Sequence, residues 1–179
     1  MGEDDSLRAR YETSQGLMDQ LRYAAETLSM EFDRWDEPHV SGPGLYFIVV
    51  ADTDYGAYTD ALGSNTWPVD RCRIVGDPLD AFIDAAREVA FSRDGAVVVA
   101  ADGTIQEQMV RVRSDGAEGM VYPDWMGTRH LSAMEASTRE EVLWAVTLSE
   151  ENGRVTTYHD GNYRDYERED LSGRWRPDG

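Results

Sequence analysis

Apolar residues recur at three- and four-residue steps near the start of the chain, which predicts one helix or a helical pair over residues 6–35. Gly16 weakens the middle of this segment, and Ser41–Gly44 ends it and turns the chain. A second apolar stripe follows Asp77–Pro78, a helix cap and first-turn proline that predict a helix ending near Phe91.

Short apolar runs bounded by turn residues predict the strands. Leu45–Ala51 and Ala96–Ala101 are continuously apolar, as strands buried on both faces are. Asp102–Gly103 and Asn152–Gly153 are two-residue hairpin signals. The other predicted strands flank these turns: an alternating run ending at Val112, Val142–Leu148 and Val155–Tyr158.

This order of elements predicts an α/β fold with a mixed β-sheet covered by helices. We expect residues 1–40 to be an N-terminal helical segment packed on the domain and residues 41–161 to be the domain itself. Residues 52–68 read as a loop. Residues 162–179 are expected to be a polar, loosely held C-terminal tail.

The net charge of the chain argues against nucleic acid as a partner. The chain has 35 acidic and 17 basic side chains, a net charge of −18, and every basic residue is arginine. Such a surface repels itself in dilute buffer and is screened at molar salt, so the composition indicates a halophilic protein from a salt-rich cytoplasm. It lacks the basic footprint that sequence-independent nucleic-acid binding requires.

No apolar stretch approaches the ~20 residues that span a bilayer, and the acidic first residues are unlike a secretory signal. We therefore expect a cytoplasmic protein without membrane association. The lone Cys72 cannot form an internal disulfide, and the three histidines are too scattered for their spacing to indicate a metal site.

Asp94–Ala96 lies at a turn from a predicted helix into a buried strand. A carboxylate held there by a rigid element can bind a divalent cation or orient a hydroxyl, and the small neighbours let a ligand approach the backbone. The alternative is a plain Asp-Gly turn, since Asp115–Ala117 repeats the tripeptide inside a polar loop.

Gly127–His130 leads from a loop into a short helix predicted over 129–139. Backbone amides at a helix amino terminus, a hydroxyl, a guanidinium and an imidazole together can bind a phosphate. An ordinary helix cap with solvated side chains is the alternative. Trp125, two residues earlier, is the one tryptophan that we single out as a possible ligand contact, because the others read as packing residues.

The three segments Asp94–Ala96, Gly127–His130 and Leu148–Gly153 resemble the diadenylate cyclase family in order and spacing. The fold of this family was first known as the amino-terminal domain of the DNA-integrity scanning protein. The resemblance covers roughly residues 76–161, about half of the chain. It implies that 41–161 is a nucleotide-binding domain.

Enzymes of that family condense two ATP molecules into cyclic di-AMP, release two pyrophosphates and use magnesium or manganese. The resemblance also implies a homo-oligomer, because two facing subunits complete each active site. Catalytic roles are implied for Asp94, as metal ligand and partner of the ribose 3′-hydroxyl, and for Arg129 and His130, on the phosphates. The residues implied to contact or border the nucleotide are Gly95, Ala96, Gly127, Thr128, Ser132, Ser149 and Glu151.

One position departs from the family motif, which usually reads Arg-His-Arg and here reads Arg129, His130, Leu131. Losing one preorganised donor to transition-state charge commonly costs roughly 3–4 kcal/mol, so the change bears on turnover more than on binding. Arg111, Arg113 or Arg139 are candidates to replace the missing guanidinium. Two alternatives remain: a weak or inactive module that binds ATP or cyclic di-AMP, and an acidic α/β domain whose motifs are structural turns.

Overall fold

The computed structural model describes residues 3–51, 54–62, 75, 79–92, 95–113, 123–167 and 171. Its helices and strands follow one another as α1 (Glu3–Glu31), β1 (Leu45–Val50), a 3-10 turn η1 (Tyr55–Ala57), β2 (Thr59–Ala61), α2 (Leu79–Ser92), β3 (Ala96–Ala100), β4 (Ile105–Val112), α3 (Thr128–Ala136), β5 (Val142–Leu148), β6 (Val155–His159) and β7 (Asn162–Tyr166).

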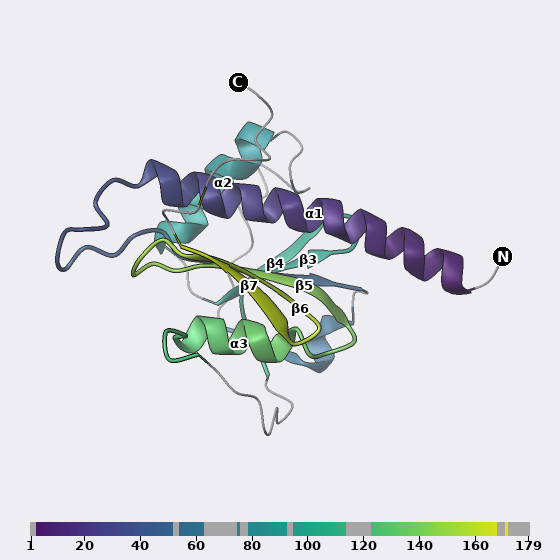
Figure 1. Cartoon of the computed structure of the whole chain (residues 1–179). Coiled ribbons are helices and arrows are strands. Elements are labelled where there is room, and N and C mark those ends of the chain that lie inside the picture. Colours follow the sequence, from purple (N-terminus) through teal and green to yellow (C-terminus); the bar gives the residue numbers. More distant parts are fainter. Residues whose placement is uncertain are drawn as a thin grey trace.

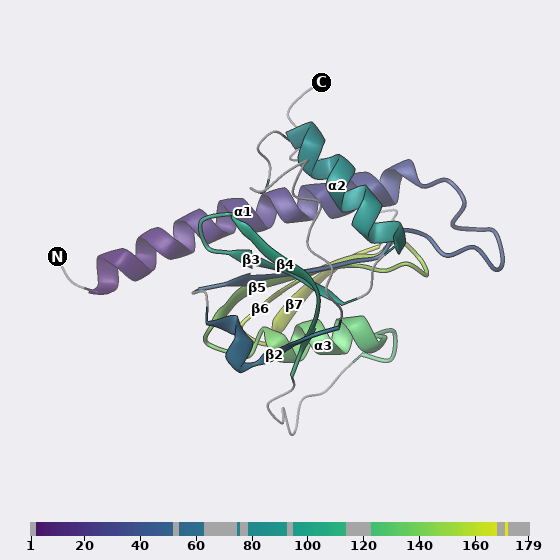
Figure 2. The same ribbon diagram turned by 180° about the vertical axis from the view of Figure 1, so that it is seen from behind.

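The described strands form one seven-stranded sheet in the order β2-β4-β3-β1-β5-β6-β7. β1 and β3 run parallel, and every other neighbouring pair is antiparallel. Helices α1 and α2 lie over one face of the sheet and α3 lies under the other (Figures 1 and 2). The predicted α/β fold with a mixed, helix-covered sheet is confirmed.

Strand β1 is buried along its whole length because helices cover both faces of the sheet. Leu45, Phe47 and Val49 pack into the cluster beneath α1 and α2. The alternate residues of β1 pack with Ala133 and Met134 of α3. The continuous apolar run that predicted this strand therefore has a direct cause: successive side chains fill opposite cores.

Two predictions for segments outside the main strands are wrong. The expected loop 52–68 contains η1 and the three-residue strand β2. The expected loose tail 162–179 begins with β7, which pairs with β6 from Val155↔Tyr166 to His159↔Asn162. The turn between them is Asp160–Gly161, where both φ angles are positive, 49° and 75°. That is the backbone of a two-residue hairpin turn, which Asp-Gly favours.

Helix α1 is part of the main core as well as a cover for it. Leu21, Ala24 and Ala25 are fully buried and Leu28 is 1% exposed, all in the cluster that also contains Phe47. Within the described part of the chain, none of the helices combines the length and the apolar character needed to cross a membrane.

Candidate functional site

A cleft of about 560 Å³ lies at one edge of the sheet. Since β1 and β3 are parallel, their amino ends meet at this edge, and the antiparallel β5 brings its carboxyl end there, pairing Leu148 with Leu45. The amino end of α3 forms part of the same cleft. This topology joins the three sequence segments, which are far apart along the chain.

Most of the residues implied by the family resemblance line this cleft. They are Gly95, Gly127, Thr128, Arg129, His130, Ser132, Ser149 and Glu151. Ala96 is fully buried in β3 and is not among the lining residues. Asp94 lies outside the described residues, although its neighbour Gly95 lines the cleft. The structure thus brings these positions together, whereas their roles remain predictions.

His130 occupies an unusual position for a titratable side chain. It is 7% exposed, and its Nδ1 accepts a 3.2 Å hydrogen bond from the backbone N–H of Gly127. The neutral ring therefore carries its proton on Nε2. Among the described residues this Nε2 has no hydrogen-bond partner. An unsatisfied buried donor costs about 1–3 kcal/mol, and a ligand oxygen in the cleft would remove that cost.

The ring of His130 is held in its neutral form. Burial, and then the positive charges of Arg154 and Arg129, lower the pKa of His130 from 6.5 to about 4. At neutral pH the side chain is an uncharged hydrogen-bond donor, and the positive charge of the cleft comes from arginine.

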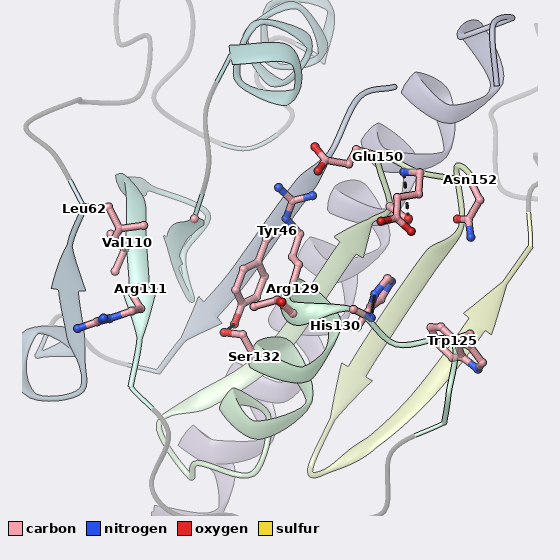
Figure 3. Close-up of a pocket in the computed structure, with 15 residues that line it drawn as sticks. Tyr46, Leu62, Val110, Arg111, Trp125, Arg129, His130, Ser132, Glu150 and Asn152 are labelled. Carbon is pink, nitrogen blue, oxygen red and sulfur yellow. Dashed lines mark hydrogen bonds between the residues drawn. The ribbon is translucent and has the colours of Figure 1, made fainter. Parts of the chain in front are cut away.

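Arg129 lies directly against the backbone of Gly44. A β-carbon placed on Gly44 would overlap with Nη1 of Arg129 and would lie 3.1 Å from Cβ of Glu150. Figure 3 shows the Arg129 side chain extending toward Glu150, along one wall of the cleft. In the sequence, Gly44 is one of several turn-forming residues, and nothing in the local pattern indicates its part in the site.

The turn after β5 forms the rim above Arg129. Ser149 closes it through the bonds Ser149 N–H to Arg154 O (2.9 Å) and Gly153 N–H to Ser149 O (3.0 Å). The Ser29 hydroxyl of α1 donates a 2.6 Å bond to the carbonyl of Gly153, and Gly42 N–H donates to Glu150 O at 2.9 Å. The rim is therefore fixed from two other segments, and it carries the exposed carboxylates of Glu150 and Glu151.

Tyr46 and Ser132 form a polar floor that the sequence only partly revealed. Their hydroxyls lie 3.1 Å apart, and Tyr46 is 4% exposed. Burial raises the pKa of Tyr46 far above its usual value, so its hydroxyl stays protonated. The signal available in the sequence was the hydroxyl of Tyr46 within the otherwise apolar run Leu45–Val50.

The three arginines considered as substitutes for a second motif guanidinium have other partners. Arg113 donates to the carbonyl of Ala57 at 2.6 Å, and Arg139 donates to the carbonyl of Arg113 at 3.1 Å. Arg111 lines the cleft, but it pairs with Asp60 at 3.2 Å and points away from Arg129 in Figure 3.

Leu131, at the departing motif position, does not line the cleft. It is half-buried and packs against the apolar cluster between α3 and the sheet. The side chain at this position is thus directed into the apolar cluster rather than into the cleft.

Within the described ranges, no three His, Cys, Asp or Glu side chains come together in a way that could hold a metal ion. A divalent cation here would depend on Asp94, which those ranges leave out, and on oxygens of a bound ligand.

Comparison with known proteins identifies relatives of the fold. The family model "DAC: DisA bacterial checkpoint controller nucleotide-binding" matches residues 68–163, slightly more than half of the chain. A search of curated proteins found no match.

Two solved structures share the fold at low identity. A hypothetical membrane spanning protein from Bacillus cereus has a TM-score of 0.58 and 16% identity, over 84% of this chain and 63% of its own. The chain thus spans less than two thirds of that relative. A double mutant of DacA from Staphylococcus aureus has a TM-score of 0.54 and 18% identity, over 88% of this chain and 91% of its own.

Proposed function

Because this chain belongs to the DisA bacterial checkpoint controller nucleotide-binding (DAC) family, we propose that it is a diadenylate cyclase. It would condense two ATP molecules into cyclic di-AMP and release two pyrophosphates. The observation that carries the proposal is the convergence of three separate segments on one cleft, one end of which is lined by Thr128, Arg129 and His130.

The end of the cleft lined by Thr128, Arg129 and His130 has groups that can bind a triphosphate. The amino end of α3, at Thr128, lines the cleft and is a type of backbone that binds anions, and Arg129 supplies a guanidinium. His130 adds a neutral Nε2–H that finds no acceptor among the described residues. Phosphoryl transfer depends chiefly on positioning and on neutralising developing charge, and these groups supply both.

The proposed reaction is a nucleotidyl transfer carried out twice. The 3′-oxygen of one ribose bonds to the α-phosphorus of the other ATP, the bond from that phosphorus to the bridging oxygen breaks, and pyrophosphate leaves. The hydroxyl proton passes to a base, for which we propose the carboxylate of Asp94. The same exchange in the opposite direction closes the ring. Arg129 and His130 would hold the phosphates in line during both transfers.

We further propose that Asp94 holds a magnesium or manganese ion. When bound, such an ion would neutralise charge on the transferring and leaving phosphates. The remaining proposed contacts, at Gly95, Ala96, Gly127, Thr128, Ser132, Ser149 and Glu151, would border the nucleotide.

The proposed reaction joins two ATP molecules, so each ATP must meet a second one. We therefore propose a homo-oligomer in which the clefts of two subunits face each other. Light scattering of the full chain at molar salt, with and without ATP, tests this part separately.

A second candidate is a weak or inactive module that binds ATP or cyclic di-AMP. Leu131 favours it, because the motif has one guanidinium fewer than is usual in the family. Because Leu131 packs on the apolar cluster and does not line the cleft, it does not obstruct ATP binding in either candidate.

Incubation of the full chain with ATP and manganese at molar KCl, followed by chromatography for cyclic di-AMP, tests the proposal. Product should disappear in Asp94→Asn and Arg129→Met and persist in Arg164→Met, a matched control on β7 outside this cleft. ATP binding without product would support the binding module. Absence of both binding and product across a salt series would refute the nucleotide assignment.

A further inference from the structure

Arg154 lies just before β6 and is clamped from β7. Its side chain is 14% exposed, with Nη1 3.4 Å from Asp165 and Nη2 3.1 Å from Glu167. Asp165 also accepts a 3.0 Å hydrogen bond from the hydroxyl of Thr156 on β6. The β6–β7 hairpin therefore holds the guanidinium in place. No motif in the sequence links this hairpin to the site.

Trp125 links this clamped guanidinium to the cleft. The guanidinium carbon of Arg154 lies 4.3 Å from the centre of the Trp125 ring, a cation–π contact. The Trp125 ring meets the His130 ring edge-on at 5.2 Å and 83°, and it meets Tyr163 of β7 at 5.8 Å. With Arg154 over its face and two rings against it, Trp125 is a spacer between Arg154 and His130 rather than a platform for a base.

We propose that Arg154 is a positioning residue that, through Trp125, holds His130 as a neutral imidazole presenting Nε2–H to the anionic ligand. Arg154 does not line the cleft, so it acts through its neighbours and through its buried charge. The inference deepens the proposed function, because the ligand that accepts from Nε2–H would be a phosphate oxygen of ATP.

The hydrogen bond at the other ring nitrogen explains why the neutral form matters. Nδ1 accepts from the N–H of Gly127, the residue that caps α3. A proton on Nδ1 would abolish this bond and set two donors against each other at the start of the helix. Keeping His130 neutral therefore preserves the backbone that presents Thr128 and Arg129 to the cleft.

The charges around His130 favour this state. Arg129 from α3 and Arg154 from the segment before β6 both disfavour the imidazolium and lower the pKa of His130. Glu150 and Glu151 face the cleft from the turn after β5, where they are exposed to solvent. The carboxylates of β7 and its end, Asp165 and Glu167, are engaged with Arg154.

Arg154 does not replace the missing motif arginine as a phosphate ligand, because it does not line the cleft. In the usual family motif a second arginine follows the histidine in sequence, and here that position packs into the core. What Arg154 supplies, from a distant part of the chain, is a second guanidinium charge near His130. The two charges that bear on His130 are thus those of Arg129 and Arg154.

Nitrogen-15 NMR of the histidine rings in the full chain, without nucleotide, tests the inference. His130→Asn assigns the resonance, since His39 and His159 remain. In the wild type we expect the proton on Nε2 and no titration above about pH 5. In Arg154→Gln the midpoint should rise toward 6.5 by about one unit, in Arg154→Lys by less, and in the matched control Arg164→Gln not at all.

A wild-type His130 protonated at Nδ1, or titrating near 6.5, would overturn the inference without any variant. An unchanged midpoint in Arg154→Gln would overturn it too. Adding ATP to the wild type then examines the proposed function separately: a shift of the Nε2 resonance supports it, whereas a silent titration counts against nucleotide binding and leaves the tautomer result standing.

Discussion

The guanidinium of Arg129 occupies the space where Gly44 would carry a β-carbon. Gly44 lies immediately before β1 and donates its N–H to the carbonyl of Ala90 at 3.0 Å, so its backbone cannot easily retreat. A glycine that looks like a turn residue therefore provides the surface on which a candidate phosphate ligand rests.

Gly44→Ala should displace Arg129 without changing any charge. The overlapping atoms belong to the flexible end of the arginine, so the fold should survive with about 1 kcal/mol lost. Losing one charge-assisted hydrogen bond costs about 1.5–3 kcal/mol, so ATP affinity should fall by roughly 10- to 100-fold. Isothermal titration calorimetry measures this change in ATP affinity. Gly56→Ala is the matched control, because nothing lies within 4 Å of its added carbon. Equal affinities for both variants would contradict this account of Gly44.

Stability should fall in acid because of His130. Its pKa is about 4 in the folded chain and 6.5 in the unfolded chain. Above pH 6.5 both states are neutral and the group contributes nothing. As the pH falls from 6.5 to 4, only the unfolded chain takes up the proton, so the folded state loses about 2–3 kcal/mol.

Urea unfolding at pH 7 and pH 4.5 measures this loss. In His130→Asn the difference between the two pH values should be smaller by about 2 kcal/mol, because the asparagine does not titrate. An amide oxygen at this position can still accept the bond from Gly127. The same pH difference in both proteins would show that His130 is not buried in its neutral form.

Gly153→Ala should be more damaging than Gly161→Ala. Both glycines have positive φ, 76° and 75°, so both substitutions carry a backbone cost of about 1–2 kcal/mol. A β-carbon on Gly153 would also lie 2.6 Å from Ser29 Oγ and 2.9 Å from the Trp35 ring, whereas on Gly161 the nearest atom is Thr138 Cγ2 at 3.3 Å.

In thermal unfolding, the free energy of unfolding of Gly153→Ala should therefore be at least about 1 kcal/mol lower than that of Gly161→Ala. The site should respond as well, because Gly153 closes the turn that carries Ser149 and Glu151. If the two variants were equally stable, the contact of Trp35 with this turn would not be a structural constraint.

Salt should stabilise the folded chain. With a net charge of −18, compact structure is opposed by self-repulsion, which molar salt screens. Between 0.1 and 2 M KCl we expect the melting temperature to rise by about 5–10 °C, or about 2–3 kcal/mol. A melting temperature that stays constant or falls over this range would contradict the interpretation of the composition as halophilic.

The sequence predicted the covered sheet because β1 and β3 are apolar throughout, which leaves few other ways to bury them. It also predicted the segments that meet at the cleft, although only as separate motifs. Their meeting depends on β1 and β3 being parallel, and no local pattern encodes that pairing.

The contributions of Gly44 and Arg154 could not be predicted in the same way. Gly44 matters because the guanidinium of Arg129 lies against its backbone. Arg154 matters because it stacks on Trp125, a contact between residues that are far apart in the sequence. β7 could have been predicted from the sequence, because Asp160–Gly161 is a hairpin signal like Asp102–Gly103 and Asn152–Gly153. The polar composition of Asn162–Tyr166 does not show the apolar pattern that is typical of a strand. Tyr166 packs against the guanidinium of Arg22, which lies 3.8 Å from the centre of its ring, and not against an aliphatic side chain.

The most direct measurement is the affinity of a non-hydrolysable ATP analogue for the wild type and for Arg129→Met, titrated at molar KCl. If a triphosphate occupies the end of the cleft formed by Thr128, Arg129 and His130, the wild type binds and the variant binds at least about 10-fold more weakly. Indistinguishable affinities would mean that the nucleotide, if it binds, lies elsewhere on the molecule.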